Sequence, residues 1–441
     1  MSQLIASGLP AVGRSAAVDM ERVEEAVLKP LVNPAGWRFT AFAWLLAAVF
    51  ATGLAAWAWQ IYHGLGVTGL GVPIFWGTYI INFVWFIGIS HAGTLISAIL
   101  RITDAAWRRP FTRIAETITI ASLPFAVTCV IVDLGRPDRL LNVLLYPHMT
   151  SPLLWDVCCI TAYFITSCLY FYIALIPDFA TCRDRLTGKV SGWREKLYRW
   201  GAFGWKGTEA EVRVHRGFMT VLSVVLLALV VSVHTNVGFV FGMTSKPGWH
   251  TAVIGPYFVI GAAFQGLGAL SFFIVFVRRA FHLEWLIPDE GLQQLRKFFL
   301  ALTCFWGYFT GAELLTTFYG QHTAEMAVFN AKWFGQYSIS FWAMIAGCFF
   351  IPFYLLATGR KNIERNLLWA GFIGNVGMWL ERYTIIVPSG SRPFLPWGIG
   401  HYSLSMVEWS IFAAWVSGFF LVFLLFTRIL PMLTIWEIEE G

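Results

Sequence analysis

The polar segment DLGRPDRLLNVLLYPHMTSPLLWD (133–156) joins two long apolar runs, TRIAETITIASLPFAVTCVIV (112–132) and LLWDVCCITAYFITSCLYFYIALIP (153–177). Each run has the roughly 20 mostly apolar residues that a helix needs to cross about 30 Å of hydrocarbon. Neither run shows the alternation of an outer-membrane strand, and only helices or closed barrels satisfy their backbone groups in lipid. The sequence therefore predicts two membrane-spanning helices joined by a short polar connection.

Five charged residues lie in segment 133–156, which is unusual for so apolar a chain. A single Asp or Arg at the centre of a spanning helix costs about 2.5–3.5 kcal/mol on an insertion scale, so these groups are expected at the ends of spans. The segment is either a plain turn, because Gly135 and Pro137 are common turn residues, or a polar mouth where a small molecule that exchanges protons docks. Both interpretations stay open at this point.

The composition of the whole chain indicates a polytopic membrane protein. Of 441 residues, 57% are hydrophobic and 13% are charged, whereas soluble domains have about 25% charged residues. We predict an all-α integral membrane protein with about ten transmembrane helices. The expected spans are 37–61, 74–100, 112–132, 153–177, 217–241, 252–277, 297–320, 333–357, 366–388 and 402–430.

The distribution of Lys and Arg predicts the orientation. Alternate connections, together with both ends of the chain, hold 25 of these residues, and the opposite connections hold five. Because basic residues concentrate on the cytoplasmic side, both termini are expected in the cytoplasm and segment 133–156 on the far side. Residues 1–36 are expected to be a cytoplasmic extension and not a signal peptide, and residues 434–441 a cytoplasmic tail. The net charge of +6 then reflects topology and does not indicate nucleic-acid binding.

The seven cysteines do not suggest a metal centre. None occurs in a C-x-x-C or C-x-x-C-H pattern, so we expect no iron–sulfur cluster, no haem and no metal ion bound by this chain alone.

Ionisable residues inside or next to the predicted spans are the main functional signal. Such groups are rare in membranes and usually face a bundle interior or an aqueous cavity. They either handle protons or satisfy neighbouring helices as neutral packing groups, and the sequence leaves both open. They are His91, Glu116, His234, His250, Glu313, Glu381, Arg382 and Glu408.

An ordered set of motifs covering nearly the whole chain resembles one known family. IVDLGRPDRLLNVLL (131–145) resembles the signature of the NrfD / polysulfide reductase membrane-subunit family. FIGISHAGTLISAILR, SPLLWDV, LIPDFATCRDR, SVHTNVGF, PGWHTAVIGPYF and GMWLERYTIIV resemble most closely its ActC-type branch, a subunit of alternative complex III.

This resemblance implies an architecture and partners. The transmembrane domain (37–433) would contain two four-helix bundles, at about 74–241 and 252–388, with flanking helices. A quinol site would lie near the periplasmic face of a bacterial cytoplasmic membrane. Expected partners are a periplasmic-side iron–sulfur subunit similar to molybdopterin oxidoreductases, a second NrfD-like membrane subunit, multihaem cytochrome c subunits and membrane lipid.

The function implied is quinol oxidation, with menaquinol as substrate and with proton translocation as a further expectation. Oxidising a quinol releases two electrons and two protons, so proton acceptors must lie about 2.6–3.2 Å from the hydroxyls. The expected catalytic groups are Asp133, Asp156 and His91, with Asp133 compensated by nearby Arg136. The expected quinol-binding groups are Arg136, His250 and Arg382, and the expected proton path comprises Glu116, His234, Glu313 and Glu408.

Three alternatives remain from the sequence. The same fold would serve quinone reduction in a polysulfide- or nitrite-reductase-like complex. A b-type cytochrome would use a pair such as His91 and His234 as axial ligands. A secondary transporter would use the buried charges to bind an ion.

Overall fold

The computed structural model describes residues 20–94, 98–102, 106–249, 251–358, 362–394 and 398–439. Within these ranges every regular element is a helix, and no β-strand is present. The elements are α1 (Met20–Val32), α2 (Trp37–His63), η1 (Leu65–Val67), α3 (Thr78–Thr94), α4 (Leu100–Ile102), η3 (Ala106–Arg108), α5 (Arg109–Asp133), η4 (Pro137–Arg139), α6 (Asn142–Leu145), α7 (Pro152–Leu186), α8 (Gly192–Gly201), α9 (Glu209–Gly242), α10 (Ile254–Ala280), α11 (Asp289–Gly320), α12 (Thr323–Trp333), α13 (Ser338–Ile345), η5 (Ala346–Phe350), α14 (Ile351–Thr358), α15 (Ile363–Ser391), α16 (Met406–Ile429) and α17 (Ile435–Glu439).

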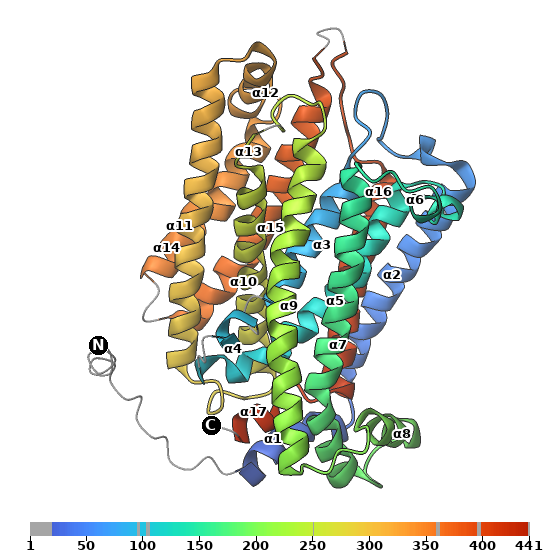
Figure 1. The fold of residues 1–441 in the computed structure, drawn as a ribbon, viewed down its shortest axis with the longest axis vertical. Coiled ribbons are helices and arrows are strands. Elements are labelled where there is room, and N and C mark those ends of the chain that lie inside the picture. The colour runs from blue at the N-terminus through green and yellow to red at the C-terminus, as the bar shows by residue number, and fades with distance from the viewer. Residues whose placement is uncertain are drawn as a thin grey trace.

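The predicted spans coincide with helices that run side by side along the long axis of the molecule (Figure 1). In the part of the chain that the structure describes, eight helices are long and apolar enough to cross a membrane. They are α2, α5, α7, α9, α10, α11, the continuous helical stretch Ser338–Thr358 and α16. The predicted spans 74–100 and 366–388 fall on α3 and α15, which lie among these helices. The all-α, multi-span membrane fold is thus confirmed.

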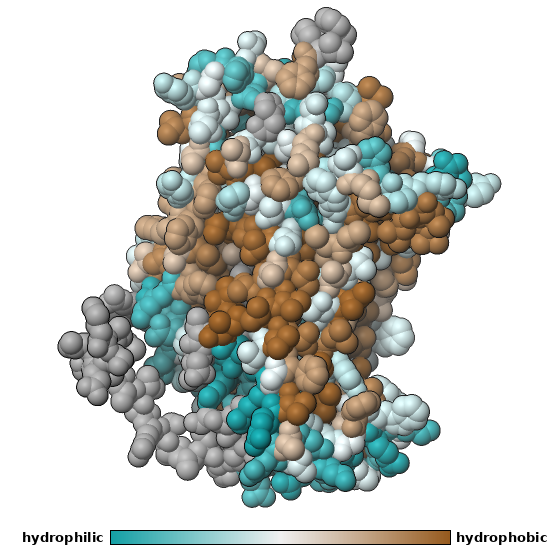
Figure 2. All heavy atoms as spheres, in the orientation of Figure 1, coloured by the Kyte–Doolittle hydropathy of each residue, from teal (hydrophilic) through white to brown (hydrophobic). Residues whose placement is uncertain are grey.

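Apolar side chains form a band around the middle of the molecule, and polar residues gather towards both ends (Figure 2). Helices α7, α9 and α11 have 35, 34 and 32 residues, well above the roughly 20 needed to span. They extend past the predicted boundaries, so these helices carry polar residues beyond the apolar band.

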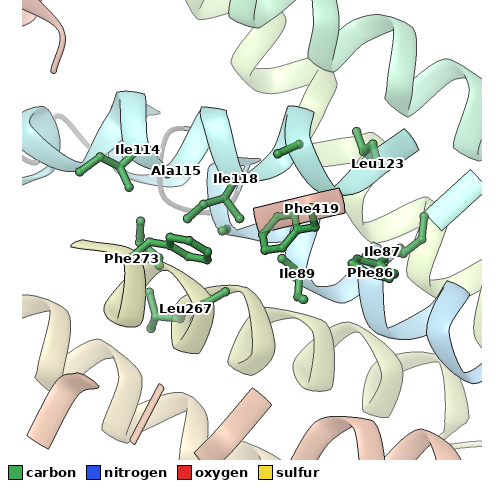
Figure 3. Close-up of a cluster of buried hydrophobic side chains, with 14 of the residues drawn as sticks. Phe86, Ile87, Ile89, Ile114, Ala115, Ile118, Leu123, Leu267, Phe273 and Phe419 are labelled. Atoms are coloured by element: carbon green, nitrogen blue, oxygen red, sulfur yellow. The ribbon is translucent and has the colours of Figure 1, made fainter. Parts of the chain in front are cut away.

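Helices α3 and α10 occupy the centre of the molecule, where both are largely buried. Small residues let them approach closely: a Cβ atom at Gly266 would lie 2.7 Å from the backbone nitrogen of Ala92. Packing through small residues is typical of membrane helices, because lipid provides no hydrophobic force between them. Around this contact, Phe273, Phe419 and Ile89 converge from α10, α16 and α3 (Figure 3).

Helix α2, by contrast, lies at the edge and packs mainly along α16, with few buried residues. The division of the remaining helices into bundles at 74–241 and 252–388 stays a prediction.

The described ends of the chain meet at the lower end of the molecule in Figure 1, where α1, α8 and α17 lie. Arg194 of α8 donates hydrogen bonds to the carbonyl oxygens of Leu31 and Arg428, at 2.9 and 2.6 Å. Arg108 donates to Glu437 of α17 at 2.9 Å. Parts of both predicted tails are therefore packed helices. That this end faces the cytoplasm stays a prediction.

Candidate functional site

Asp133 is the last residue of α5, at the upper end of the molecule (Figure 1). The helix stops there because Gly135 follows with a φ of +64°, a conformation that favours glycine, and Pro137 prevents its continuation. The Asp133 side chain is half-buried. Its Oδ1 atom is buried and has no hydrogen-bond partner within the described part of the chain. It is therefore a desolvated acceptor at the end of a span.

A hydrogen-bonded cluster from α2, α3 and α16 lies next to Asp133. Tyr79 donates to Gln60, and Gln60 donates to the carbonyl oxygen of Val132, one residue before Asp133, at 3.1 Å. The carboxyls of Asp133 and Glu408 are near enough to interact electrostatically. We call Gln60, Tyr79, Asp133 and Glu408, together with Thr78 and Tyr402, the upper cluster.

Glu408 is fully buried in the upper cluster and well satisfied. Tyr402 donates to its Oε1 atom at 2.5 Å, and the backbone nitrogens of Gly69 and Ser405 donate to its Oε2 atom at 2.8 and 2.9 Å. Ser405 and Glu408 form a capping box at the start of α16. Burial and the Glu408 charge raise the pKa of Tyr402, which keeps its hydroxyl a donor.

Arg136 is not placed as expected. Its guanidinium makes two hydrogen bonds of 3.0 Å to Asp138, and both side chains are largely exposed. These hydrogen bonds hold the pKa of Asp138 below its usual range. No hydrogen bond or ion pair between Arg136 and Asp133 occurs among the described residues. The expectation that the charge of Arg136 compensates that of Asp133 is therefore wrong, because Asp138 in the same loop pairs with the guanidinium instead.

Asp156 is the fifth residue of α7, which begins at Pro152, towards the same upper end as Asp133. Its side chain is 7% exposed, and its Oδ1 atom has no hydrogen-bond partner in the described ranges. It lies near Cys159, whose Sγ atom accepts a hydrogen bond of 2.8 Å from Asn236 of α9. Asp156 is a second buried carboxyl at this end, facing α9.

His91 lies well below Asp133. It is 13 residues from Thr78 of the upper cluster on α3, or about 20 Å along the helix. Its ring lies 5.5 Å from that of Tyr163, which is seven residues, or about 10 Å, from Asp156 on α7. The His91 ring is also in edge contact with that of His234, with centroids 4.1 Å apart. An axially ligated haem needs iron and macrocycle between the two imidazoles, so this pair does not fit a b-type haem.

A fully buried ion pair lies close to these histidines. Arg382 Nη1 is 2.6 Å from Glu381 Oε2, and the guanidinium stacks over the ring of Phe258. The Arg382 charge acts on both His91 and His234. Neither ring nitrogen of His234 has a hydrogen-bond partner in the portion that the structure describes.

Through Glu381, the ion pair also contacts α11. Trp306 donates to Glu381 at 2.9 Å, and Tyr257 lies near both Glu381 and Glu313. Beyond Tyr257, a cavity of about 30 Å³ is lined by Glu313 and Lys332. Such a volume can hold one or two ordered waters when polar groups line it.

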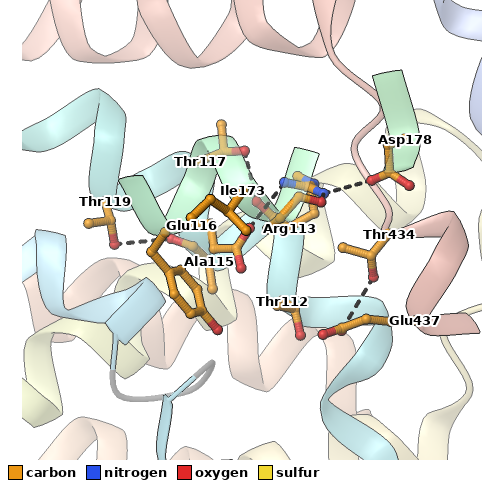
Figure 4. A network of polar contacts seen from close by, with 12 residues as sticks. Thr112, Arg113, Ala115, Glu116, Thr117, Thr119, Ile173, Asp178, Thr434 and Glu437 are labelled. Atoms are coloured by element: carbon orange, nitrogen blue, oxygen red, sulfur yellow. Dashed lines mark hydrogen bonds and ion pairs between the residues drawn. The ribbon is translucent and has the colours of Figure 1, made fainter. Parts of the chain in front are cut away.

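Glu116 lies near the start of α5, towards the lower end of the molecule. It belongs to a network that joins α5 to α7 and α17 (Figure 4). Arg113 donates to Glu116 at 3.2 Å and to Asp178 at 2.6 Å. Asp178 also accepts from the backbone nitrogen of Ile435 at 3.2 Å. All three charged side chains are almost completely buried.

The predicted site residues thus fall into two groups. Asp133 and Glu408 lie in the upper cluster, with Asp156 at the same end. Arg382, His234, His91 and Glu116 are buried, and Glu313 is half-buried. We call these five residues, from Glu313 near the upper end to Glu116 near the lower end, the row of buried polar groups. Glu408 was expected on that row and lies in the upper cluster instead. His250 lies outside the described residues.

Several polar residues of the site went unnoticed in the sequence. Gln60, Tyr79 and Tyr402 complete the upper cluster, and Lys332, Arg113 and Asp178 complete the row. In the described residues, no group of three or more His, Cys, Asp or Glu side chains could hold a metal ion. The described site can accept and pass protons through carboxyl, phenol and imidazole groups.

The chain is similar to subunits of reductases and of a menaquinol oxidoreductase. The chain is 26% identical to a putative dimethyl sulfoxide reductase membrane subunit of Halobacterium salinarum, over 75% of this chain and 72% of that protein. It is 24% identical to the Hdr-like menaquinol oxidoreductase integral membrane subunit of Archaeoglobus fulgidus, over 91% and 96%. It is 22% identical to a selenate reductase subunit of Mesobacillus selenatarsenatis, over 85% and 89%.

The sequence profile of one family, described as polysulphide reductase, NrfD, matches residues 66–392. This range contains every predicted span except the first and the last, both aspartates at the upper end and the entire row of buried groups. The chain belongs to the NrfD polysulphide reductase family.

Proposed function

We propose that this chain is the quinol-oxidising membrane subunit of a respiratory electron-transfer complex similar to alternative complex III. The relative from Archaeoglobus fulgidus, aligned over nearly its whole length, is named as a menaquinol oxidoreductase membrane subunit. The single observation that carries the proposal is Asp133: a buried, unpartnered carboxyl oxygen, among the described residues, next to a hydrogen-bonded cluster at the end of a span.

In this proposal the quinol headgroup binds at the upper end, between the upper cluster and α7. The Asp133 carboxylate accepts a proton from one hydroxyl, and Asp156 accepts the second. The two protons then leave to the far side, and the two electrons leave for a partner subunit, so the quinol is released as quinone. In this proposal His91, about 20 Å along α3 from Thr78, takes no part at the headgroup. We place it on the row of buried groups.

The electrons require an acceptor outside this chain. We propose a periplasmic-side iron–sulfur subunit similar to molybdopterin oxidoreductases, above the upper end, with a second NrfD-like membrane subunit and multihaem cytochrome c subunits in the same complex. The complex would lie in the bacterial cytoplasmic membrane, with the basic lower end in the cytoplasm. The conspicuously exposed Leu141, Leu145 and Tyr146 around α6 would then lie at the far interface.

The reverse reaction is the second candidate, because two of the relatives are named as subunits of reductases. Quinone reduction would use the same carboxyls as proton donors. The deciding experiment supplies the intact complex in vesicles with menaquinol plus an oxidised acceptor, and separately with menaquinone plus a reduced donor. Faster turnover from menaquinol supports the proposal, and turnover only from menaquinone contradicts it.

We further propose that the row of buried polar groups moves protons across the membrane. The proposed path runs from Glu313 past Tyr257 to the Glu381–Arg382 ion pair, and then past the paired histidines towards Glu116. Buried ionisable groups in membranes often mark proton relays. The alternative is that these groups only satisfy one another, and the proton-to-electron ratio measured in sealed vesicles separates the two.

A further inference from the structure

A long apolar groove runs along α16 and is bounded by α3, α10 and α15. Its volume is about 440 Å³, within the roughly 300–1,000 Å³ typical of small-molecule sites. Aromatic side chains make up much of its wall. We call it the aromatic groove, and the residues used below are Trp85, Trp379, Trp409, Val416 and Phe420.

The dimensions of the aromatic groove fit a hydrocarbon chain. From Trp409 to Phe420 it follows eleven residues of α16, or about 16 Å at 1.5 Å per residue. Dividing the volume by this length gives a mean cross-section of about 27 Å². The groove is therefore long enough and wide enough for one linear hydrocarbon chain.

The wall presents almost no polar group to an occupant. The indole nitrogen of Trp85 donates to the carbonyl oxygen of Asn375 at 2.9 Å, and that of Trp379 donates to Asn82 at 2.9 Å. Both indole N–H groups are thus satisfied inside the protein. The ring surfaces that remain favour a chain held by dispersion and apolar burial.

The upper end of the aromatic groove meets the upper cluster. Thr78, Asn82, Trp85 and Ile89 have the i, i+4, i+7 and i+11 spacing of one face of α3. Thr78 is hydrogen-bonded to Tyr402 at 2.7 Å, and Asn82 to Trp379 of the groove. On α3, two helical turns, or about 10 Å, separate Thr78 from Trp85 of the groove, and on α16 Trp409 of the groove directly follows Glu408 of the upper cluster.

We propose that the aromatic groove binds the isoprenoid side chain of the quinol whose headgroup reacts at the upper cluster. This inference rests on the proposed function. It assigns the chain-length preference of the reaction to α3, α15 and α16, and it predicts that quinol enters laterally from the lipid along this groove. An acyl chain of a phospholipid is the competing occupant, and photolabelling separates the two.

The test uses the intact complex in vesicles, with Val416→Trp to fill the aromatic groove. Leu425→Trp adds the same ring on the opposite side of α16, because Leu425 is exposed and lies nine residues, or two and a half turns, from Val416; it serves as the control. Turnover is measured with a long-chain isoprenoid menaquinol and with a quinol of the same headgroup and no side chain. We expect Val416→Trp to raise the ratio of the two KM values about tenfold, as for the loss of one or two buried methylene groups. Leu425→Trp should leave that ratio unchanged.

A second measurement uses photoreactive groups in the side chain. A menaquinol with a diazirine in its isoprenoid chain should label α15 and α16 peptides of the groove, and Val416→Trp should reduce the labelling. An unchanged KM ratio, or labelling of these peptides by a diazirine-bearing phospholipid but not by the quinol, overturns the inference. If the wild-type complex oxidises neither quinol, the proposed function itself fails, which is a distinct result.

Discussion

Asp156 is a single buried carboxyl whose Oδ1 atom has no hydrogen-bond partner among the described residues. We expect Asp156→Asn to lower quinol turnover by about 10²-fold, because the amide keeps the shape of the side chain but cannot accept a proton as a general base. The measurement is quinol oxidation by the assembled complex. Near-normal turnover in an assembled Asp156→Asn complex would remove Asp156 from the site.

The position of Asp133 and Asp156 near the ends of two helices could be predicted from the sequence, because Asp133 follows one apolar run and Asp156 lies near the start of the next. The sequence could not reveal Gln60 or Tyr402. Their contacts join residues that are 72 and 324 positions apart, and no local pattern encodes such pairs. The position of Glu408 at a helix start could have been predicted, since Ser405 and Glu408 have the S-x-x-E spacing of a capping box. That spacing indicates a helix start and not a mid-span group.

Among the helices, the contact between α3 and α10 depends on Gly266. A Cβ atom there would lie 2.7 and 2.8 Å from backbone atoms of Ala92 and His91, which cannot move without shifting α3. We expect Gly266→Ala to lower the free energy of unfolding by about 1–3 kcal/mol, as for overpacking. The measurement is thermal unfolding of the purified complex.

Gly217 of α9 is the matched control for this substitution, because a Cβ atom there would meet nothing within 4 Å. Gly217→Ala should be neutral or slightly stabilising, since alanine favours helix. Equal stability of the two variants would contradict the close packing of α3 on α10.

The elements themselves were largely predictable, because apolar runs of membrane length leave the chain little choice but helix. Their ends were not. α7 continues to Leu186, nine residues past the predicted end of its span at 177, because a polar extension can stay helical outside lipid. The buried pair of Arg113 and Asp178 joins two such helices, and only the fold brings these residues together.

For the whole molecule, the asymmetry of basic residues predicts that the lower end is cytoplasmic. Lys189 lies in the lower connection and His148 in the upper one, and both are exposed. We expect an impermeant thiol reagent to label His148→Cys from the periplasmic side of sealed vesicles and to leave Lys189→Cys unlabelled. The parent protein controls for its own cysteines. The opposite labelling pattern would reverse the topology, and the proposed site would then face the cytoplasm.

The row of buried groups also belongs to the scale of the whole molecule, because it reaches from Glu313 near the upper end to Glu116 near the lower end. We expect Glu116→Gln and Glu313→Gln each to lower the proton-to-electron ratio of the complex in sealed vesicles, since a relay fails when a titrating member is removed. If both variants keep the wild-type ratio and the wild-type rate of quinol oxidation, these carboxyls are structural.

The central claim is that quinol is oxidised at the upper end, with Asp133 as proton acceptor. Its most direct test is quinol oxidation by the assembled complex carrying Asp133→Asn, compared with Asp138→Asn. Asp138 lies five residues away and is exposed in its pair with Arg136, so it controls for a lost charge in the same loop. We predict a loss of about 10²-fold or more for Asp133→Asn and near-normal turnover for Asp138→Asn. Wild-type turnover in Asp133→Asn would contradict the account.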